Sequence, residues 1–320
     1  MSGIYEGRLI SEYYGEAISH DVIFLGDCEV YENISPITLW KNYGISSYIR
    51  GGPQQLIWQS YYLLEDTLRY EKPSVVVFSV LSMQYNKPQK EGYNRLNIDG
   101  MPLTDYKMES AKASAMKDES LLSYVFPLLR YHDRWKELCA DDFQYYFSEK
   151  KVSVSGFMMR CDVKPVDVIP DGKKLPDYQF GKNSYKYLDM LTKLCKDKGI
   201  RLILIKTPSI YPYWYKQWND QMADYADKTD LTYINCLDLA SEIGIDYYTD
   251  TYDAGLHLNV YGAEKMGYYL GNILADSVPD RRDNPKYASV WNEKVQVYNW
   301  LKATQEREVK EFSKIKTFTY

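Results

Sequence analysis

Short apolar runs alternate along this chain with longer amphipathic segments, and this alternation limits the fold more than any other feature. Strands are predicted at residues 21–26, 45–49, 74–81, 200–205 and 231–235. Helical periodicity is found at residues 36–42, 54–70, 185–198, 213–227, 260–275 and 285–310. Strands that are apolar on both faces and separated by helices indicate a parallel sheet covered on both sides. We therefore expect an α/β fold, a three-layer α/β/α sandwich with a flavodoxin-like sheet.

The stretch from residue 84 to residue 182 interrupts this alternation. It predicts two or three helices within 106–147, a hairpin over 152–168 and a loop over 167–181 that is rich in Pro, Gly and Lys. Because strands of the same sheet are predicted on both sides of it, the stretch is not an independent domain. We expect one domain over residues 1–320, with 84–182 as a mostly helical cap insertion.

Charge and composition exclude several classes of protein. The net charge is −5, and Lys and Arg are scattered, so the sequence has no nucleic-acid footprint. No apolar run approaches the ~18 residues of a membrane helix, and the first twenty residues do not form a signal peptide. We expect either a cytoplasmic protein or, our preference, an extracytoplasmic one whose export segment or membrane anchor lies outside this sequence.

Cysteine and histidine usage narrows the chemistry further. Five cysteines without paired spacing argue against a disulfide framework. The three histidines, His20, His132 and His257, form no metal-binding pair in the sequence. We therefore expect no metal and no cofactor, and any histidine chemistry must use one of these three residues. His20 precedes the first strand, on the wrong side of the sheet, and His132 lies in the insertion as a partly buried residue or as part of a cap over the site.

The ends of the predicted strands carry the residues with chemical potential. Cys28 follows Gly-Asp after the first strand, where backbone N–H groups at a helix start favour a thiolate. His257 follows the last strand and is a candidate base, with Asp253 as the carboxylate that orients it and Asp250 as the alternative. Asp27 is expected to cap the helix after the first strand, and Asn259 the helix after His257.

Two glycines, Gly51 and Gly52, end the second strand. Glycine lets bare backbone approach a ligand oxygen, which an oxyanion hole requires. Arg95 in the insertion is a candidate clamp for an anionic group, or an ordinary surface residue.

The sequence FLGDC at residues 24–28 and the late D…HLN ending at residue 259 resemble the first and last blocks of the SGNH (GDSL-type) hydrolase superfamily. The resemblance covers the sheet elements, about 21–82 and 200–275. It is closest in character to extracytoplasmic members that modify polysaccharides or the cell wall, including the D-alanyl-transfer proteins of teichoic acids. It implies an ester hydrolase or acyltransferase in which Gly51 or Gly52 occupies the oxyanion position.

Three departures from the family pattern concern the site. The nucleophile position is Cys28 rather than serine, so an acyl intermediate would be a thioester. The family's closing block is D-x-x-H, which would put the Asp three residues before His257, at position 254. That position is Ala here, and the nearest Asp is Asp253, four residues before His257. The third block's Gly-x-Asn is absent after the third strand, and the candidate replacements for its donor are Ser82, Gln84 and Asn86.

Tyrosine is unusually frequent, with 33 residues. An aromatic run follows the strand at 200–205 and therefore lies at the carboxyl edge of the sheet; it comprises Tyr211, Tyr213, Trp214, Tyr215 and Trp218. Such rings stack on sugars or pack a helix onto the core, and the sequence leaves both readings open. Tyr252 is also placed near this edge.

The predicted function is that of an SGNH-like ester hydrolase or acyltransferase with a Cys28–His257–Asp253 arrangement. The expected substrate is an acyl group, acetyl first, on a carbohydrate or another acylated small molecule. The alternative is an inactive protein of the same fold that binds a glycan or a protein partner.

Overall fold

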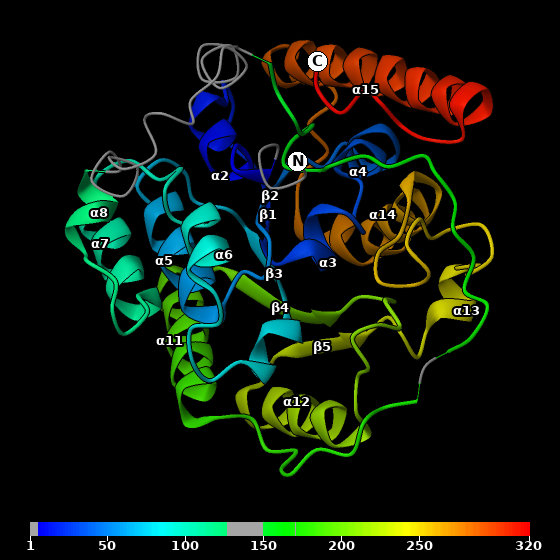
Figure 1. Ribbon diagram of the computed structural model, residues 1–320. Coiled ribbons are helices and arrows are strands. Elements are labelled where there is room, and N and C mark those ends of the chain that lie inside the picture. The colour runs from blue at the N-terminus through cyan, green and yellow to red at the C-terminus, as the bar shows by residue number, and fades with distance from the viewer. Residues whose placement is uncertain (1–5, 127–149, 170) are drawn as a thin grey trace, which may run out of the picture.

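Five parallel strands form one sheet in the order β2-β1-β3-β4-β5 (Figure 1). The computed structural model describes residues 6–126, 150–169 and 171–320. The strands are β1 (Val22–Gly26), β2 (Ser47–Gly51), β3 (Val75–Ser79), β4 (Arg201–Lys206) and β5 (Thr232–Asn235). Each neighbouring pair is parallel. The predicted α/β class and flavodoxin-like strand order are therefore confirmed.

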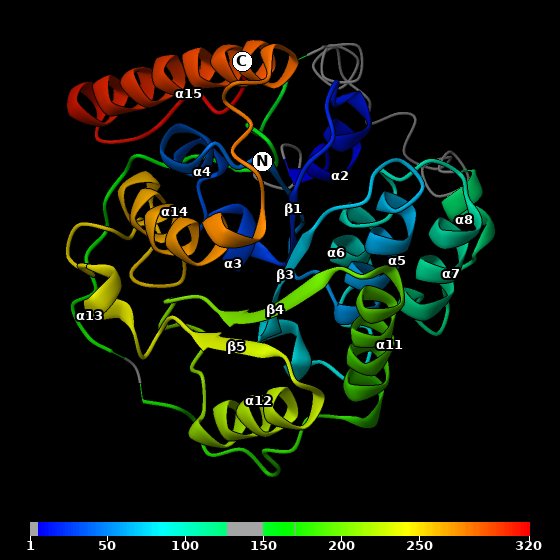
Figure 2. The same cartoon turned by 180° about the vertical axis from the view of Figure 1, so that it is seen from behind.

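Alternate side chains of each strand enter two separate apolar layers. In β1, Val22 and Phe24 join the layer under one set of helices, and Ile23 and Leu25 join the other. The first layer contains α3 (Cys28–Tyr31), α4 (Pro36–Tyr43), α14 (Val260–Leu274) and α15 (Pro285–Phe312). The second contains α5 (Ile57–Thr67), α11 (Lys182–Lys198) and α12 (Lys216–Thr229). Figures 1 and 2 show α15 lying outside α4 and α14.

Local sequence signals set the ends of these helices. Ser35 caps α4 through its hydroxyl, Pro36 occupies the first turn, and Gly44 ends the helix at φ 66°. Gly199 ends α11 in the same left-handed conformation. The predicted outer helix is present as α15, and its Trp291 ring stacks on Trp40 at a centroid distance of 5.3 Å.

The insertion divides into two parts that pack in different places. Its helices α6 (Glu91–Leu96), α7 (Asp105–Ser114) and α8 (Leu122–Val125) lie beside α5, and Trp58 Nε1 donates to Ser114 Oγ at 3.0 Å. The later part runs along the outside of β2, where Ile49 N donates to Ser155 O at 3.0 Å. The hairpin predicted over 152–168 is reduced to one isolated bridge between Val154 and Phe157. The cap role of 84–182 stays a prediction.

Near the carboxyl end of β1 the backbone comes unusually close to α3. A Cβ atom on Gly51 would lie 2.9 Å from Val30 Cγ2 and 3.0 Å from the Gly26 carbonyl oxygen. Gly26 itself has φ 149°, and a Cβ there would lie 2.8 Å from Ser79 Cβ. These small residues let α3 begin directly against the strand ends.

Among the described residues, no helix is long and apolar enough to cross a membrane.

We expect Gly51→Ala to lower the free energy of unfolding by about 1–3 kcal/mol, because its methyl group overpacks the contact with Val30. Gly92→Ala is the control, since a Cβ at Gly92 meets open space. Urea unfolding of both variants measures the difference. Equal stabilities would contradict the close approach at Gly51.

Candidate functional site

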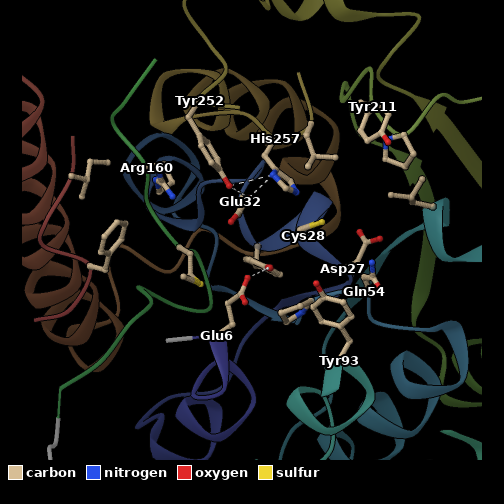
Figure 3. A pocket seen from close by; sticks show the side chains of 18 of the residues that line it. Glu6, Asp27, Cys28, Glu32, Gln54, Tyr93, Arg160, Tyr211, Tyr252 and His257 are labelled. Carbon is tan, nitrogen blue, oxygen red and sulfur yellow. Dashed lines mark hydrogen bonds and ion pairs between the residues drawn. The ribbon is translucent and has the colours of Figure 1, made fainter. Parts of the chain in front are cut away.

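A cavity of about 900 Å³ opens at the carboxyl ends of the strands, the edge at which parallel sheets bind ligands (Figure 3). Its walls come from the strand ends, the insertion, the segment after α15 and the chain before α2 (Leu9–Glu12). They are lined by Glu6, Asp27, Cys28, Tyr31, Glu32, Pro53, Gln54, Leu81, Tyr85, Tyr93, Met158, Arg160, Tyr211, Pro212, Tyr252, Leu256, His257, Ile315, Lys316 and Phe318.

Cys28 is the first residue of α3 and faces this cavity half-buried. Asp27 precedes it as the helix cap, and its carboxylate accepts from Glu29 N at 3.1 Å. The capping role predicted for Asp27 is thus present, and this carboxylate also lines the cavity. Asn259 likewise caps α14, accepting from the N–H groups of Tyr261 and Gly262.

His257 is held by Asp253 through both its ring and its backbone. Its Nδ1 lies 2.6 Å from Asp253 Oδ2, and its backbone N–H donates to Asp253 Oδ1 at 2.8 Å. The intervening turn passes through Ala254 at φ 63°, which brings two residues four positions apart face to face. Asp250 is instead buried in an ion pair with Lys265 at 2.6 Å. Of the two predicted acids, the structure brings Asp253 to the histidine.

A second carboxylate, which the sequence reading missed, reaches the same ring nitrogen. Glu32 Oε2 lies 3.0 Å from His257 Nδ1. The Tyr252 hydroxyl donates to the same Glu32 oxygen at 2.5 Å, and the Tyr252 ring stacks on the His257 ring at a centroid distance of 5.7 Å. The available signal was the spacing of four residues between Cys28 and Glu32, which places both on one side of a helical turn.

Electrostatics set the protonation of the Cys28–His257 pair. Burial raises the pKa of the Cys28 thiol to about 12, although the charge of His257 lowers it. Burial alone lowers the pKa of His257, but Glu32, Cys28 and Asp253 more than reverse this and raise it to about 12. The directions of the two pKa shifts favour a neutral thiol beside an imidazolium at neutral pH. Desolvation and the nearby Glu29 charge also raise the pKa of Asp27, to about 7.

Asn33 ties the histidine loop to the loop after β4. Its side-chain oxygen accepts from Leu258 N at 2.8 Å, and its Nδ2 donates to Thr207 Oγ1 at 3.0 Å and Ser209 Oγ at 2.8 Å. All of these groups are buried. The residue next to His257 is therefore fixed from the strand side.

A buried ion pair lies beneath α3. Lys206 at the end of β4 contacts Glu29 Oε1 at 2.5 Å and donates to the carbonyl oxygens of Thr207 and Ser209. Ser79 at the end of β3 donates to the other Glu29 oxygen at 3.2 Å. This cluster joins the turn that carries Cys28 to two neighbouring strands, and the sequence reading did not identify it.

The predicted oxyanion glycines do not line the cavity. The Gly52 N–H already donates to the Gly26 carbonyl at 3.3 Å, and Gly51 packs against Val30. Their place at the wall is taken by Pro53 and Gln54, and Gln54 has φ 47°. The assignment of Gly51 and Gly52 to the oxyanion position is corrected accordingly.

None of the candidate replacements for the missing Asn lines the cavity either. Ser82 is buried, and Gln84 donates to the Leu81 carbonyl at 3.0 Å. Asn86 accepts from Asn183 N at 2.8 Å and so holds the start of α11. Leu81 and Tyr85 reach the wall from this segment instead.

Two further candidates lie away from this cavity. Arg95 is 3% exposed and contacts Glu119 and Asp99, with its guanidinium over the Tyr124 ring at 4.0 Å, so it organises the insertion instead of clamping a ligand. His20 is buried against Glu71 at 3.1 Å near the amino end of β1, as expected. His132 lies outside the described residues.

The predicted aromatic platform is only partly present. In the run after β4, Tyr211 lines the cavity. Tyr213 packs on the Tyr215 ring and is exposed to solvent. Trp214 and Trp218 are core residues packed on Phe180. The other rings at the cavity come from other segments, and they are Tyr31, Tyr85, Tyr93, Tyr252 and Phe318.

Within the part of the chain that the structure describes, no group of His, Cys, Asp and Glu has the geometry of a metal site. No protein-family model matches this chain, and no curated protein matches it.

Solved structures with a similar fold were found. One is named as a lipolytic protein of the G-D-S-L family from Desulfitobacterium hafniense (14% identity, TM-score 0.38, 80% of this chain and 100% of that chain). Another is a GDSL-like lipase from Bacteroides thetaiotaomicron (11%, 0.40, 86% and 100%). A third is named as an acylhydrolase from Bacteroides fragilis (14%, 0.39, 83% and 94%). The first two names refer to the superfamily that the sequence motifs resemble.

We expect Lys206→Met to lower the free energy of unfolding by about 3–5 kcal/mol, because it leaves the Glu29 carboxylate buried without its cation. The double variant Glu29→Gln/Lys206→Met removes both charges and should cost less. Urea denaturation of both variants measures this difference. A single variant no less stable than the double would refute the ion pair's structural role.

Proposed function

We propose that this protein is an SGNH-like ester hydrolase or acyltransferase that uses Cys28 as its nucleophile. One observation carries the proposal: His257, fixed by Asp253 at 2.6 Å, lines the strand-end cavity together with Cys28, and among the described residues its buried Nε2 has no hydrogen-bond partner. A carboxylate on one ring nitrogen fixes the tautomer, so that the opposite nitrogen is left for the nucleophile.

Before Cys28 can attack, the resting pair of Cys28 thiol and His257 imidazolium must lose one proton. Loss of that proton leaves a Cys28 thiolate beside the His257 imidazolium. The thiolate forms a C–S bond to the ester carbonyl, and the carbonyl π electrons move onto oxygen. When this intermediate collapses, the C–O bond breaks and the leaving alkoxide takes the proton of His257 Nε2. The product of this half-reaction is a Cys28 thioester.

The second half-reaction regenerates the thiolate. Neutral His257 takes a proton from water or from an acceptor hydroxyl as that oxygen attacks the thioester carbonyl. The C–S bond then breaks, and the acid or the new ester leaves. Among the described residues, no acceptor is found for the Cys28 backbone N–H, and we assign it to the developing oxyanion.

A carbohydrate ester, with acetyl as the first candidate, fits the cavity best. Its volume is in the range of small-molecule sites, and five of its lining side chains are tyrosines. Tyrosine offers a flat ring for stacking and a hydroxyl for hydrogen bonds with sugar hydroxyls. The Glu6 and Asp27 carboxyl groups add acceptors for such hydroxyls.

The second candidate function is binding without turnover. The neutral resting thiol and the engaged Gly52 N–H favour a protein that holds a glycan in the same cavity. The two functions differ in one measurable respect, which is whether Cys28 becomes acylated.

We expect Cys28→Ala to abolish p-nitrophenyl acetate turnover, with a loss of about 10²-fold or more, because no thioester can form. Cys28→Ser should retain part of the rate. Cys195→Ala is the matched control, since Cys195 is buried in the layer with α11 and lies away from the cavity. Unchanged turnover in Cys28→Ala would discard the thiol mechanism and leave the binding function.

We expect alkylation of Cys28 by iodoacetamide to become faster from pH 6 to pH 9, because the raised pKa keeps the thiol neutral at pH 7 and the thiolate fraction grows about tenfold per pH unit. His257→Asn should slow the reaction at each pH, since the cation that lowers the Cys28 pKa is lost. Mass spectrometry of the labelled peptide gives the rates. A rate independent of pH over this range would mean that the thiolate is already formed.

A further inference from the structure

Glu32 belongs to the same turn as the nucleophile. Cys28 begins α3 and Glu32 is the residue that ends it, so the two lie one helical turn apart. The Glu32 side chain is 8% exposed. A carboxylate with so little access to water needs partners that replace its hydration. Among the described residues, the Tyr252 hydroxyl and the His257 ring take this role.

The His257 ring nitrogen has two acceptors and one proton. Asp253 and Glu32 approach Nδ1 at 2.6 Å and 3.0 Å. Ionised carboxylates only accept, so Nδ1 donates its proton to them. The Tyr252 hydroxyl also lies 3.2 Å from Nδ1, and because that nitrogen carries the proton, the Tyr252 O–H points to Glu32. Two adjacent carboxylates repel each other, and a positive ring between them offsets that repulsion.

The two carboxylates hold the histidine in different ways. Asp253 lies in the histidine's own loop and also binds its backbone N–H, so it sets the orientation of the ring. Glu32 comes from α3, and in the described part of the chain its carboxylate contacts the ring nitrogen and the Tyr252 hydroxyl. Its contribution to His257 is therefore mainly charge.

The surroundings of this pair are charged on several sides. Arg160 lies over the Tyr252 ring at 4.3 Å and is itself paired with Asp162 at 2.7 Å. The titratable and charged groups that face His257 and Glu32 come from α3 and its cap, the histidine loop, the chain before α2 and the later insertion, and they are Asp27, Cys28, Tyr31, Tyr252, Asp253, Glu6 and Arg160.

We propose that Glu32 is a second carboxylate positioning residue of the site, which together with the Tyr252 hydroxyl keeps the His257 ring charged while Asp253 keeps it oriented. The role of this charge in catalysis rests on the proposed function, but the charge itself does not. Glu32 thereby sets the pH at which the Cys28–His257 pair loses the proton that must leave before attack.

The test is an NMR titration of the histidine rings in protein labelled with [¹³C]histidine. The sequence has three histidines, so substitution of His20 and His132 assigns the His257 signal. We expect Glu32→Gln to lower the pH at which the His257 ring loses its proton by roughly 1–3 units, because a carboxylate at this distance is removed. The measurement needs no turnover.

Glu6→Gln is the matched control. Glu6 is a carboxylate of the same cavity, but it is bonded to the Tyr31 hydroxyl at 2.9 Å and does not contact the histidine. We expect it to move the titration less than Glu32→Gln does. Tyr252→Phe keeps the stacked ring but removes the hydrogen bond that stabilises the Glu32 charge, so it should move the titration in the same direction as Glu32→Gln and by less. It serves as the second variant if Glu32→Gln does not fold.

The proposal is overturned if the His257 ring in Glu32→Gln stays charged to as high a pH as in the parent protein. It is also overturned if Glu6→Gln shifts the His257 titration as much as Glu32→Gln does. If Glu32→Gln does not fold, a parent-like titration in Tyr252→Phe overturns it. A shift specific to Glu32 in a protein that turns over no ester supports the role of Glu32 while discarding the proposed enzyme. The two failures are therefore distinguishable.

Discussion

The contact between Glu29 and Lys206 is the interaction on which the site's geometry depends. It ties the turn that begins with Cys28 to the end of β4, and Lys206 also binds the carbonyl oxygens of the loop after that strand. Asn33 then joins this loop to the residue after His257. The thiol and the imidazole belong to segments more than two hundred residues apart. The buried charge pair and the Asn33 amide connect these segments, in addition to the direct contact of Glu32 with His257.

The fold was predictable because its signals are local. Short apolar runs such as 74–81 and 200–205 predict buried strands, and they contain β3 and most of β4. Gly44 and Gly199 mark helix ends through their backbone conformation. The meeting of Cys28 and His257 at one cavity was predictable for a related reason. The ends of parallel strands meet at one edge of the sheet, whatever their separation in sequence.

The parts of the site that were missed depend on side-chain direction. Gly51 and Gly52 end the correct strand, but their backbone is used against Gly26 and Val30. Trp214 follows the correct strand, but its side chain turns into the core. Phe318 reaches the cavity from the segment after α15, so no strand-end argument could find it. Periodicity reports which element a residue belongs to, and packing between distant elements decides where it points.

The position of α3 has a further consequence. This single turn carries the Cys28 sulfur atom at its start and the Glu32 carboxylate just past its end. It packs closely on Gly26 and Gly51 at the strand ends. A ligand or substitution that shifts this turn moves both groups relative to His257 at once. A displacement of α3 would therefore change the reactivity of the Cys28 thiol and the charge of the His257 ring together.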